Sequence, residues 1–340
     1  MCIRDSFHSV TTKYNFLFNG NNLYAEGLSD LENDVRENFW TLLPLEKFKF
    51  YRIDDEERET NFTRAEEKAT LAIQKHSMNV DGKERNPIMD QAYFLLGKAR
   101  YYDNRFIPAL EAFNYILYKY PTSEYINKVK IWKEKINIRL DQNKYAIDNL
   151  KELLEEENLL IEERSLANSY LAQSFINIEQ IDSAAYFLKK SNQQFKNIKN
   201  NPRNTFLLAQ LYQELKVKDT ASELYSEIID LNRKIPRKFY IHSYINKSSI
   251  SDSIENSIME LKELAINFEN NNFFDIIYHQ IAMLNLKKSD SIKRLKDSLA
   301  VHYFNKSLRS DTDDEILIAK NYNELAELNF ENKEYLQAGL

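Results

Sequence analysis

The residues able to do chemistry in this chain form no known catalytic pattern. The histidines have neither HExxH spacing nor a second histidine within four residues. They are His8, His76, His242, His279 and His302. The Gly-Lys pairs at 82–83 and 97–98 lack the Gly and the Ser or Thr of a phosphate-binding loop, and no GxSxG motif occurs. Glu155 and Glu157 lie on a polar helix face, and Cys2 is the single cysteine, which excludes a cysteine-based metal cluster. We expect no catalytic site, metal or cofactor.

A pair of amphipathic helices is the clearest structural pattern. In residues 92–121, AYFLLGKARYYDNRFIPALEAFNYILYKYP, apolar side chains recur three or four residues apart. Gly97 and Ala109 are small where two helix backbones would approach each other, and Pro121 ends the second helix. This spacing resembles the tetratricopeptide repeat (TPR), a helix pair with a period of about 34 residues.

The same pattern recurs along the chain at intervals of 37, 38 and 37 residues. The small position of the second helix is occupied by Ala109, Ala146, Ala184 and Ala221. The facing position on the first helix is occupied by Gly97, Glu134, Ala172 and Ala209. The large position between successive repeats is occupied by Phe113, Leu150, Leu188 and Tyr225. Because Glu134 is not small, we expect the second repeat to be splayed.

Composition favours helices throughout. The 340 residues are 43% hydrophobic and include only five Gly and six Pro, too few for the turns of a β-sandwich or a Rossmann-type fold. The prediction is an all-α chain: a right-handed superhelical TPR solenoid of antiparallel helix pairs. Its expected parts are an artefactual stub (1–6), a degenerate helix pair and linker (7–60), the TPR array (61–235) and degenerate TPR-like helices (236–340). The best repeats lie near 90–123, 127–160, 165–198 and 202–235.

The regions outside the best repeats are less regular. We expect the first helix pair to turn at Asn19 and Gly20, the acidic run within 47–61 to be a solvated linker rather than a binding tail, and 77–88 to be a loop. Near the end, the small and bulky repeat positions fall at Leu325, Ala326, Tyr335 and Ala338. The pattern then stops one turn into a second helix, so we expect the sequence to be truncated at both ends.

The net charge and its distribution bear on which classes of partner the chain can bind. Lys and Arg number 46 against 52 Asp and Glu, a net charge of −6 with both signs interspersed, which gives no electrostatic case for nucleic acid. No apolar run approaches the roughly 18 residues that a membrane span needs, and MCIRDS lacks the apolar region of a secretory signal.

Solenoids of this type bind partners through the concave face formed by the first helix of each repeat. The expected partner-binding residues are Lys98, Tyr102, Trp132, Lys135, Arg139, Gln173, Asn177, Gln210 and Gln213. We expect Trp132, as an exposed apolar anchor between Lys135 and Arg139, to be the centre of the site. Two alternatives remain open: the polar side chains are simply solvated, and Trp132 packs between the first and second repeats.

Three stretches are more specific than the repeat spacing: residues 7–20, 75–121 and 132–140. Together they resemble the SprE/PorW-type proteins, large TPR lipoproteins of Bacteroidetes associated with type IX secretion and gliding motility. The resemblance covers almost all of residues 7–340, as the N-terminal part of a longer protein. It implies a non-enzymatic scaffold on the outer membrane, facing the periplasm and linking other proteins. Such proteins carry their lipid-accepting cysteine farther ahead of the Phe-His pair than Cys2, so membrane attachment would require an anchor missing from this sequence.

Other functions also fit a TPR array. SusD-type glycan-binding lipoproteins use such repeats, but they carry long Gly- and Trp-rich loops, and both residue types are scarce here. A chaperone adaptor that grips a carboxylate would require Lys and Asn at fixed groove positions. Lys98 fits that requirement in part, whereas Phe94 and Leu95 stand where polar residues would be expected. An enzyme remains an alternative only if chemistry resides in the missing C-terminal part.

Overall fold

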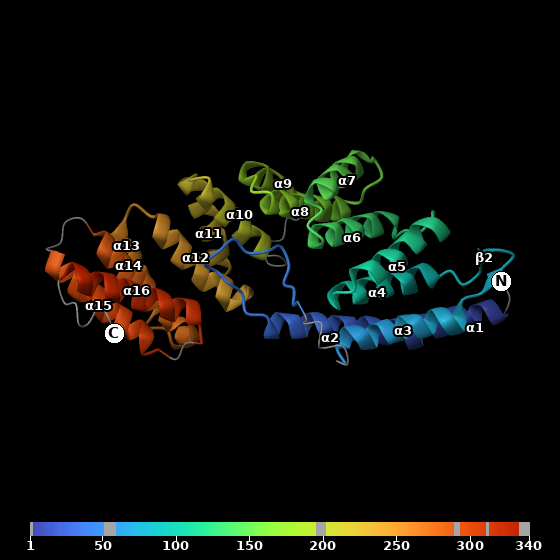
Figure 1. The fold of residues 1–340 in the computed structure, drawn as a ribbon, viewed down its shortest axis with the longest axis horizontal. Helices are drawn as coiled ribbons and strands as arrows, with labels where there is room; N and C mark the ends of the chain where they lie inside the picture. Colours follow the sequence, from blue (N-terminus) through green and yellow to red (C-terminus); the bar gives the residue numbers. More distant parts are fainter. Residues whose placement is uncertain (1–2, 51–58, 195–201, 289–292, 311–312, 333–340) are drawn as a thin grey trace. The chain divides into compact units, whose positions relative to one another are not determined.

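The computed structural model describes residues 3–50, 59–194, 202–288, 293–310 and 313–332. The chain forms two compact units, residues 1–196 and 197–340. Helices dominate both units, and the all-α TPR solenoid expected from the sequence is confirmed (Figure 1). Within the described residues, no helix combines the length and the apolar character required to cross a bilayer.

The first unit begins with one continuous helical stretch. It consists of α1 (Ile3–Thr11), the π-helical η1 (Thr12–Leu17) and α2 (Phe18–Asp34). The predicted turn at Asn19 and Gly20 is therefore wrong. Gly20 serves close packing instead: a Cβ there would lie 2.7 Å from Leu95 Cδ2 and 3.2 Å from Lys68 Cβ. A glycine in a helix allows a neighbouring element to approach, and sequence alone does not separate this use from a turn.

Helix α3 (Asn61–His76) runs alongside α2 (Figure 1). It begins with a capping box in which the Thr60 hydroxyl accepts from the Thr63 amide at 3.1 Å, and the Thr63 hydroxyl accepts from the Thr60 amide at 2.8 Å. The two helices are in close contact, because a Cβ at Gly27 would lie 2.8 Å from Phe62 Cε1. The α2–α3 pair is therefore held by its own packing.

A short hairpin follows α3 within the predicted loop 77–88. Strands β1 (Asn79–Val80) and β2 (Lys83–Glu84) pair antiparallel, with Asn79 opposite Glu84. Asp81 and Gly82 form the turn with positive φ angles of 50° and 75°. An Asp-Gly pair adopts this two-residue turn readily, because both central positions require positive φ.

Regular helix pairs then continue the first unit: α4 (Met89–Tyr102) with α5 (Phe106–Lys119), α6 (Ile126–Arg139) with α7 (Asn143–Glu155), and α8 (Ile161–Asn177) with α9 (Ile181–Gln194). The second unit begins with the pair α10 (Pro202–Glu214) and α11 (Lys218–Leu231). It continues with η3 (Asn232–Lys234), α12 (Arg237–Ile250), α13 (Ile254–Leu264), η4 (Phe268–Phe273), α14 (Phe274–Lys287), α15 (Lys293–Leu308) and α16 (Glu315–Glu331). Leu325 and Ala326 lie in α16, whereas Tyr335 and Ala338 lie outside the described residues.

The predicted small and large positions form the core of each pair. Relative exposure is 0% for Ala109, Ala146, Ala184, Ala221, Phe113, Leu150, Leu188 and Tyr225. Gly97 is required for packing, because a Cβ there would lie 2.7 Å from Phe113 Cζ. Glu134, at the corresponding position of the second repeat, is also buried, and its carboxylate accepts hydrogen bonds from Asn137 at 2.8 Å and Asn149 at 3.0 Å. Whether this repeat is splayed stays a prediction.

One type of turn joins the two helices of each of these four pairs. The residue with positive φ is Asn104, Asp141, Glu179 or Lys216, each between 60° and 61°. In the first turn the amide of Asn104 donates to Tyr101 O at 3.1 Å, and the amide of Arg105 donates to Arg100 O at 2.9 Å. This is the Schellman arrangement, which satisfies the last carbonyl groups of a helix. The chain therefore builds these turns without glycine.

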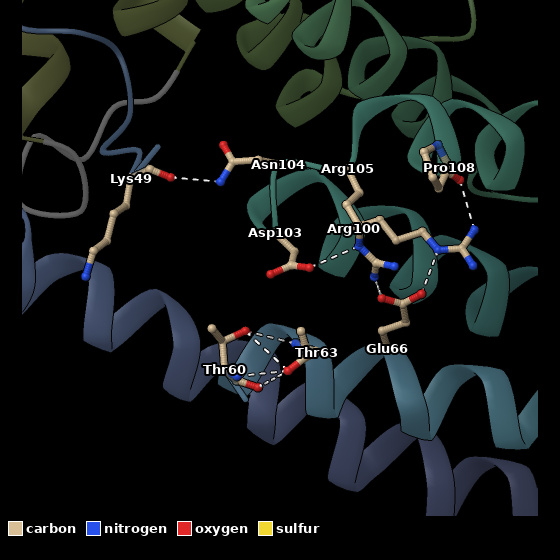
Figure 2. A network of polar contacts seen from close by, with 9 residues as sticks. All are labelled: Lys49, Thr60, Thr63, Glu66, Arg100, Asp103, Asn104, Arg105 and Pro108. Carbon is tan, nitrogen blue, oxygen red and sulfur yellow. Dashed lines mark hydrogen bonds and ion pairs between the residues drawn. The ribbon is translucent and has the colours of Figure 1, made fainter. Parts of the chain in front are cut away.

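A polar network ties α3 to the first helix pair (Figure 2). Glu66 of α3 accepts from Arg100 Nε at 2.9 Å and pairs with Arg105. Arg100 also donates to Pro108 O at 3.0 Å, and Arg105 Nε donates to Asp103 at 3.0 Å. These contacts fix the ends of α4 and α5 against the α2–α3 pair.

The buried alanines give a stability prediction. We expect Ala184→Leu to lower the free energy of unfolding by about 1–3 kcal/mol, because added methylene groups have no space in a close helix contact. Lys189→Leu, at an exposed position of the same helix, should change it by less than about 0.5 kcal/mol. Urea unfolding followed by circular dichroism measures both, and equal effects would contradict the packing assignment.

The turns give a second prediction. Glu179→Gly should raise the free energy of unfolding by about 1 kcal/mol, because glycine adopts positive φ without the Cβ clash of glutamate. Glu179→Ala keeps the Cβ and is the matched control, with no comparable gain expected. The measurement is the urea midpoint of both variants, and a stabilisation by alanine equal to that by glycine would refute this account.

Candidate functional site

The candidate site is a groove on the inner helices of the first unit, occupied by the chain itself. Residues 35–50, here called the connecting segment, follow α2 and contain no helix or strand. Their contacts reach α4, α6 and α8, the first helices of three successive pairs. The groove residues that bond to the segment or pack against it define the inner groove: Tyr101, Tyr102, Lys135, Arg139, Tyr170 and Gln173.

Glu46 is the centre of these contacts. Among the described residues, the groups that hold its carboxylate are two cations and three tyrosine hydroxyls. Oε1 accepts from Tyr101 and, at 3.1 Å, from Arg139 Nη2. Oε2 lies 2.9 Å from Lys135 Nζ, 3.0 Å from the Tyr170 hydroxyl and 3.2 Å from the Tyr102 hydroxyl. Taken together, the two oxygens are bonded by groups from all three inner helices.

The electrostatics favour an ionised Glu46. Burial alone would raise the pKa of this carboxyl group, but the charges of Lys135 and Arg139 and the Tyr101 hydroxyl outweigh burial and lower the pKa to about 2. Burial, together with the charge of Glu46, raises the pKa of Tyr101 and of Tyr170 well above 10. These tyrosines therefore remain protonated and donate to the carboxylate.

Contacts on either side of Glu46 align the connecting segment. The Leu45 amide donates to Gln173 Oε1 at 2.8 Å. The guanidinium of Arg139 lies 4.1 Å from the centre of the Phe48 ring, which packs edge-on against Tyr101 with the ring centres 5.4 Å apart. Asn104 Nδ2 donates to Lys49 O at 3.1 Å (Figure 2). The segment is thus held through both its backbone and its side chains.

Lys47 points to a different partner. Its ammonium group lies 3.3 Å from Glu32 of α2 and 3.7 Å from Glu37 of the connecting segment. Glu46 and Phe48 therefore contact the inner groove, whereas the residue between them contacts the segment and the helix before it. This alternation is expected of an extended chain, in which successive side chains point in opposite directions.

Trp132 is part of the core beneath the groove. It is half-buried, and its ring packs edge-on against Phe94 at 6.2 Å and Tyr101 at 5.3 Å between ring centres. Lys135 Nζ lies 3.6 Å from the centre of the Trp132 ring. The expectation of an exposed Trp132 is therefore wrong, and its contacts match the alternative of packing between the first and second repeats. The reason is that the aromatic side chains of α4 cover this ring.

The nine predicted groove residues differ in their contacts. Tyr102, Lys135, Arg139 and Gln173 contact the connecting segment. Asn177 accepts from Gln173 Nε2 at 2.8 Å, beside a cavity of about 280 Å³ that Gln173 and Asn177 line.

For the other predicted residues the structure gives different contacts. Lys98 lies 4.3 Å from the centre of the Tyr24 ring, and burial lowers its pKa to about 8. Gln210 and Gln213 belong to the second unit, where Gln210 is buried and Gln213 accepts from the Tyr225 hydroxyl at 3.0 Å. A role of any of these residues in binding a partner stays a prediction.

Sequence reasoning missed Glu46, Phe48 and Tyr170. The available signal was the stretch KFKF (47–50), in which charged and apolar residues alternate as in an extended chain. The acidic part of the predicted linker, within 51–58, lies outside the described residues.

The described residues show no group of three or more His, Cys, Asp and Glu side chains arranged to hold a metal ion. Two histidines meet where sequence spacing gave no hint, since His8 Nδ1 lies 2.9 Å from His76 Nδ1. His279 Nδ1 lies 2.9 Å from Asn321 Oδ1.

The ionised Glu46 gives a pH-dependent prediction. We expect Glu46→Gln to lower the free energy of unfolding at pH 7 by about 3–5 kcal/mol, because Lys135 and Arg139 would remain buried without a counter-charge. The folded-state pKa, about 2, lies below the ordinary value of 4.5. The stabilisation is therefore fully present above pH 4.5 and is lost as the pH falls towards 2.

Thermal and urea unfolding between pH 7 and pH 2 measure this difference. Asp34→Asn is the control, because Asp34 pairs with Lys49 at 3.6 Å through an exposed side chain and should contribute less than about 1 kcal/mol. If the difference between wild type and Glu46→Gln were independent of pH, the carboxylate would not be the stabilising group.

Comparison with known proteins identifies the fold. No protein-family model and no curated protein matches this chain. Among solved structures, the C-terminal part of a TPR repeat-containing protein from Cytophaga hutchinsonii is 14% identical, with a TM-score of 0.52 over 76% of this chain and 94% of the other. A TPR protein from Parabacteroides merdae is 13% identical, with a TM-score of 0.42 over 92% and 99%. The chain thus has the fold of the tetratricopeptide-repeat proteins.

Proposed function

We propose that this chain is a non-enzymatic TPR scaffold that binds segments of other proteins in the bacterial cell envelope. The observation that carries the proposal is the inner groove, which holds an extended peptide segment through a backbone amide, a carboxylate and an aromatic ring. A groove that holds one extended segment in this way has the chemistry to hold another. Binding of this kind requires no catalytic group, and the cations and tyrosine hydroxyls around Glu46 hold the segment.

The finer part of the proposal is a role in type IX protein secretion and gliding motility. Its support is the resemblance of residues 7–20, 75–121 and 132–140 to the SprE/PorW-type lipoproteins. The same resemblance supports a location on the outer membrane facing the periplasm, with attachment through a lipid anchor. The net charge of −6 adds no support for nucleic acid as a partner.

The test is capture of partners from envelope extracts of a gliding bacterium that has type IX secretion. The full chain, immobilised, should retain secretion-system proteins identified by mass spectrometry. Arg139→Glu, which reverses a charge inside the groove, should lower their recovery at least fivefold. Lys189→Glu, on the exposed face of α9, should leave it unchanged.

The other possible outcomes of this experiment lead to different conclusions. Recovery of glycans alone would favour a SusD-like ligand-binding protein over the scaffold. Equal recovery by wild type and Arg139→Glu would place binding outside the inner groove. Recovery of envelope proteins with none from the secretion system would leave the scaffold and remove the type IX assignment.

A further inference from the structure

We propose that the inner groove binds, from a partner protein, an extended segment in which Glu is followed two positions later by Phe, and that residues 45–48 of the connecting segment are a resident, exchangeable copy of that ligand. The inference rests on the proposed function and specifies the chemistry of the partner. Its basis is the set of contacts that the groove makes with individual atoms of the connecting segment.

The groove makes specific demands at two side chains. At position 46 it offers Lys135, Arg139 and three tyrosine hydroxyls, which together suit a carboxylate. At position 48 it offers the Arg139 guanidinium and the Tyr101 ring, which suit an aromatic side chain. Lys47, between them, is held by Glu32 and Glu37, which lie outside the groove.

Charge makes an acidic ligand obligatory. The side chains of Lys135 and Arg139 are only 4% and 18% exposed, so two cations are largely removed from water. Glu46 supplies one negative charge to this pair. A neutral segment in its place would leave both cations buried without any counter-charge, which is strongly unfavourable. The groove thus discriminates for a carboxylate at this position.

The helices that flank the connecting segment are also held by contacts that do not involve it. Helices α2 and α3 contact each other directly at Gly27 and Phe62, and α3 has its own cap at Thr60 and Thr63. The segment also fills the groove incompletely. A cavity of about 280 Å³ lies between it and α6 and α8, and Phe50 at its edge is 70% exposed.

The tether explains why an external ligand must compete. A ligand segment that belongs to the same chain as its binding site has an effective concentration of about 1 mM or more. A free peptide with the same contacts therefore binds the wild-type chain weakly. A partner displaces the tethered segment when it gains further binding free energy, either by filling the adjacent cavity or by making further contacts along the inner helices.

The experiment uses the full chain and two fluorescent peptides, TLLPLEKFKF (residues 41–50) and its counterpart with Gln at the position of Glu46. In the Glu46→Gln chain the tethered ligand is weakened. By fluorescence polarisation, this chain should bind the Glu peptide at least tenfold more tightly than the Gln peptide, and at least tenfold more tightly than the wild-type chain does.

Two further substitutions in the Glu46→Gln chain identify the binding surface. Adding Arg139→Gln should abolish the preference for the Glu peptide. Adding Lys130→Gln should leave it intact, because Lys130 lies on the same helix but pairs with Glu156 at 2.6 Å outside the groove. Equal binding of both peptides by a folded Glu46→Gln chain would overturn the inference.

Amide hydrogen exchange on the wild-type chain gives an answer even if Glu46→Gln does not fold. Excess Glu peptide should accelerate exchange of the Leu45 amide, which donates to Gln173, while the core amides of α4 and α6 stay protected. Unchanged protection of Leu45 at peptide concentrations up to 5 mM would show that the connecting segment is a permanent part of the fold. That result would leave the extract experiment unaffected, since capture of envelope proteins measures binding by the whole chain.

Discussion

The burial of Glu46 between Lys135 and Arg139 is the interaction on which the arrangement of the first unit depends. Removing these charges from water costs free energy. The ion pairs offset this desolvation cost only because hydrogen bonds satisfy both carboxylate oxygens. Those bonds come from α4, α6 and α8, so one carboxylate joins three successive helix pairs. The connecting segment, residues 35–50, thereby becomes part of the solenoid.

The repeat geometry makes this junction possible. Small residues such as Gly97, Ala109 and Ala146 bring the paired helices close together, and the same Schellman turn sets the start of each second helix. Equivalent positions of the first helices then face a common side at regular intervals. Lys135 and Arg139 are four residues apart and share one face of α6, which lets both reach the same carboxylate.

Stability and binding are linked in this groove. The groups that hold the connecting segment are also the groups that would bind a partner. The groove therefore binds either its own segment or a partner segment, but not both at once. A partner gains affinity only beyond what the tethered segment already provides. This competition makes the groove selective for partners with an acidic group, because a segment without one cannot neutralise Lys135 and Arg139.

The sequence by itself determined the helix pairs, the buried alanines and the side of α6 and α8 that carries Lys135, Arg139 and Gln173. Each follows from a spacing of three or four residues within a helix, or from a repeat of nearly constant length. Only the tertiary structure decided that Gly20 packs within a helix, that Trp132 is covered, and that Glu46 occupies the groove. Glu46 bonds to tyrosines 55 to 124 positions away. Helix periodicity is a property of neighbouring residues, whereas the occupant of a groove is set by charge and shape complementarity between distant ones.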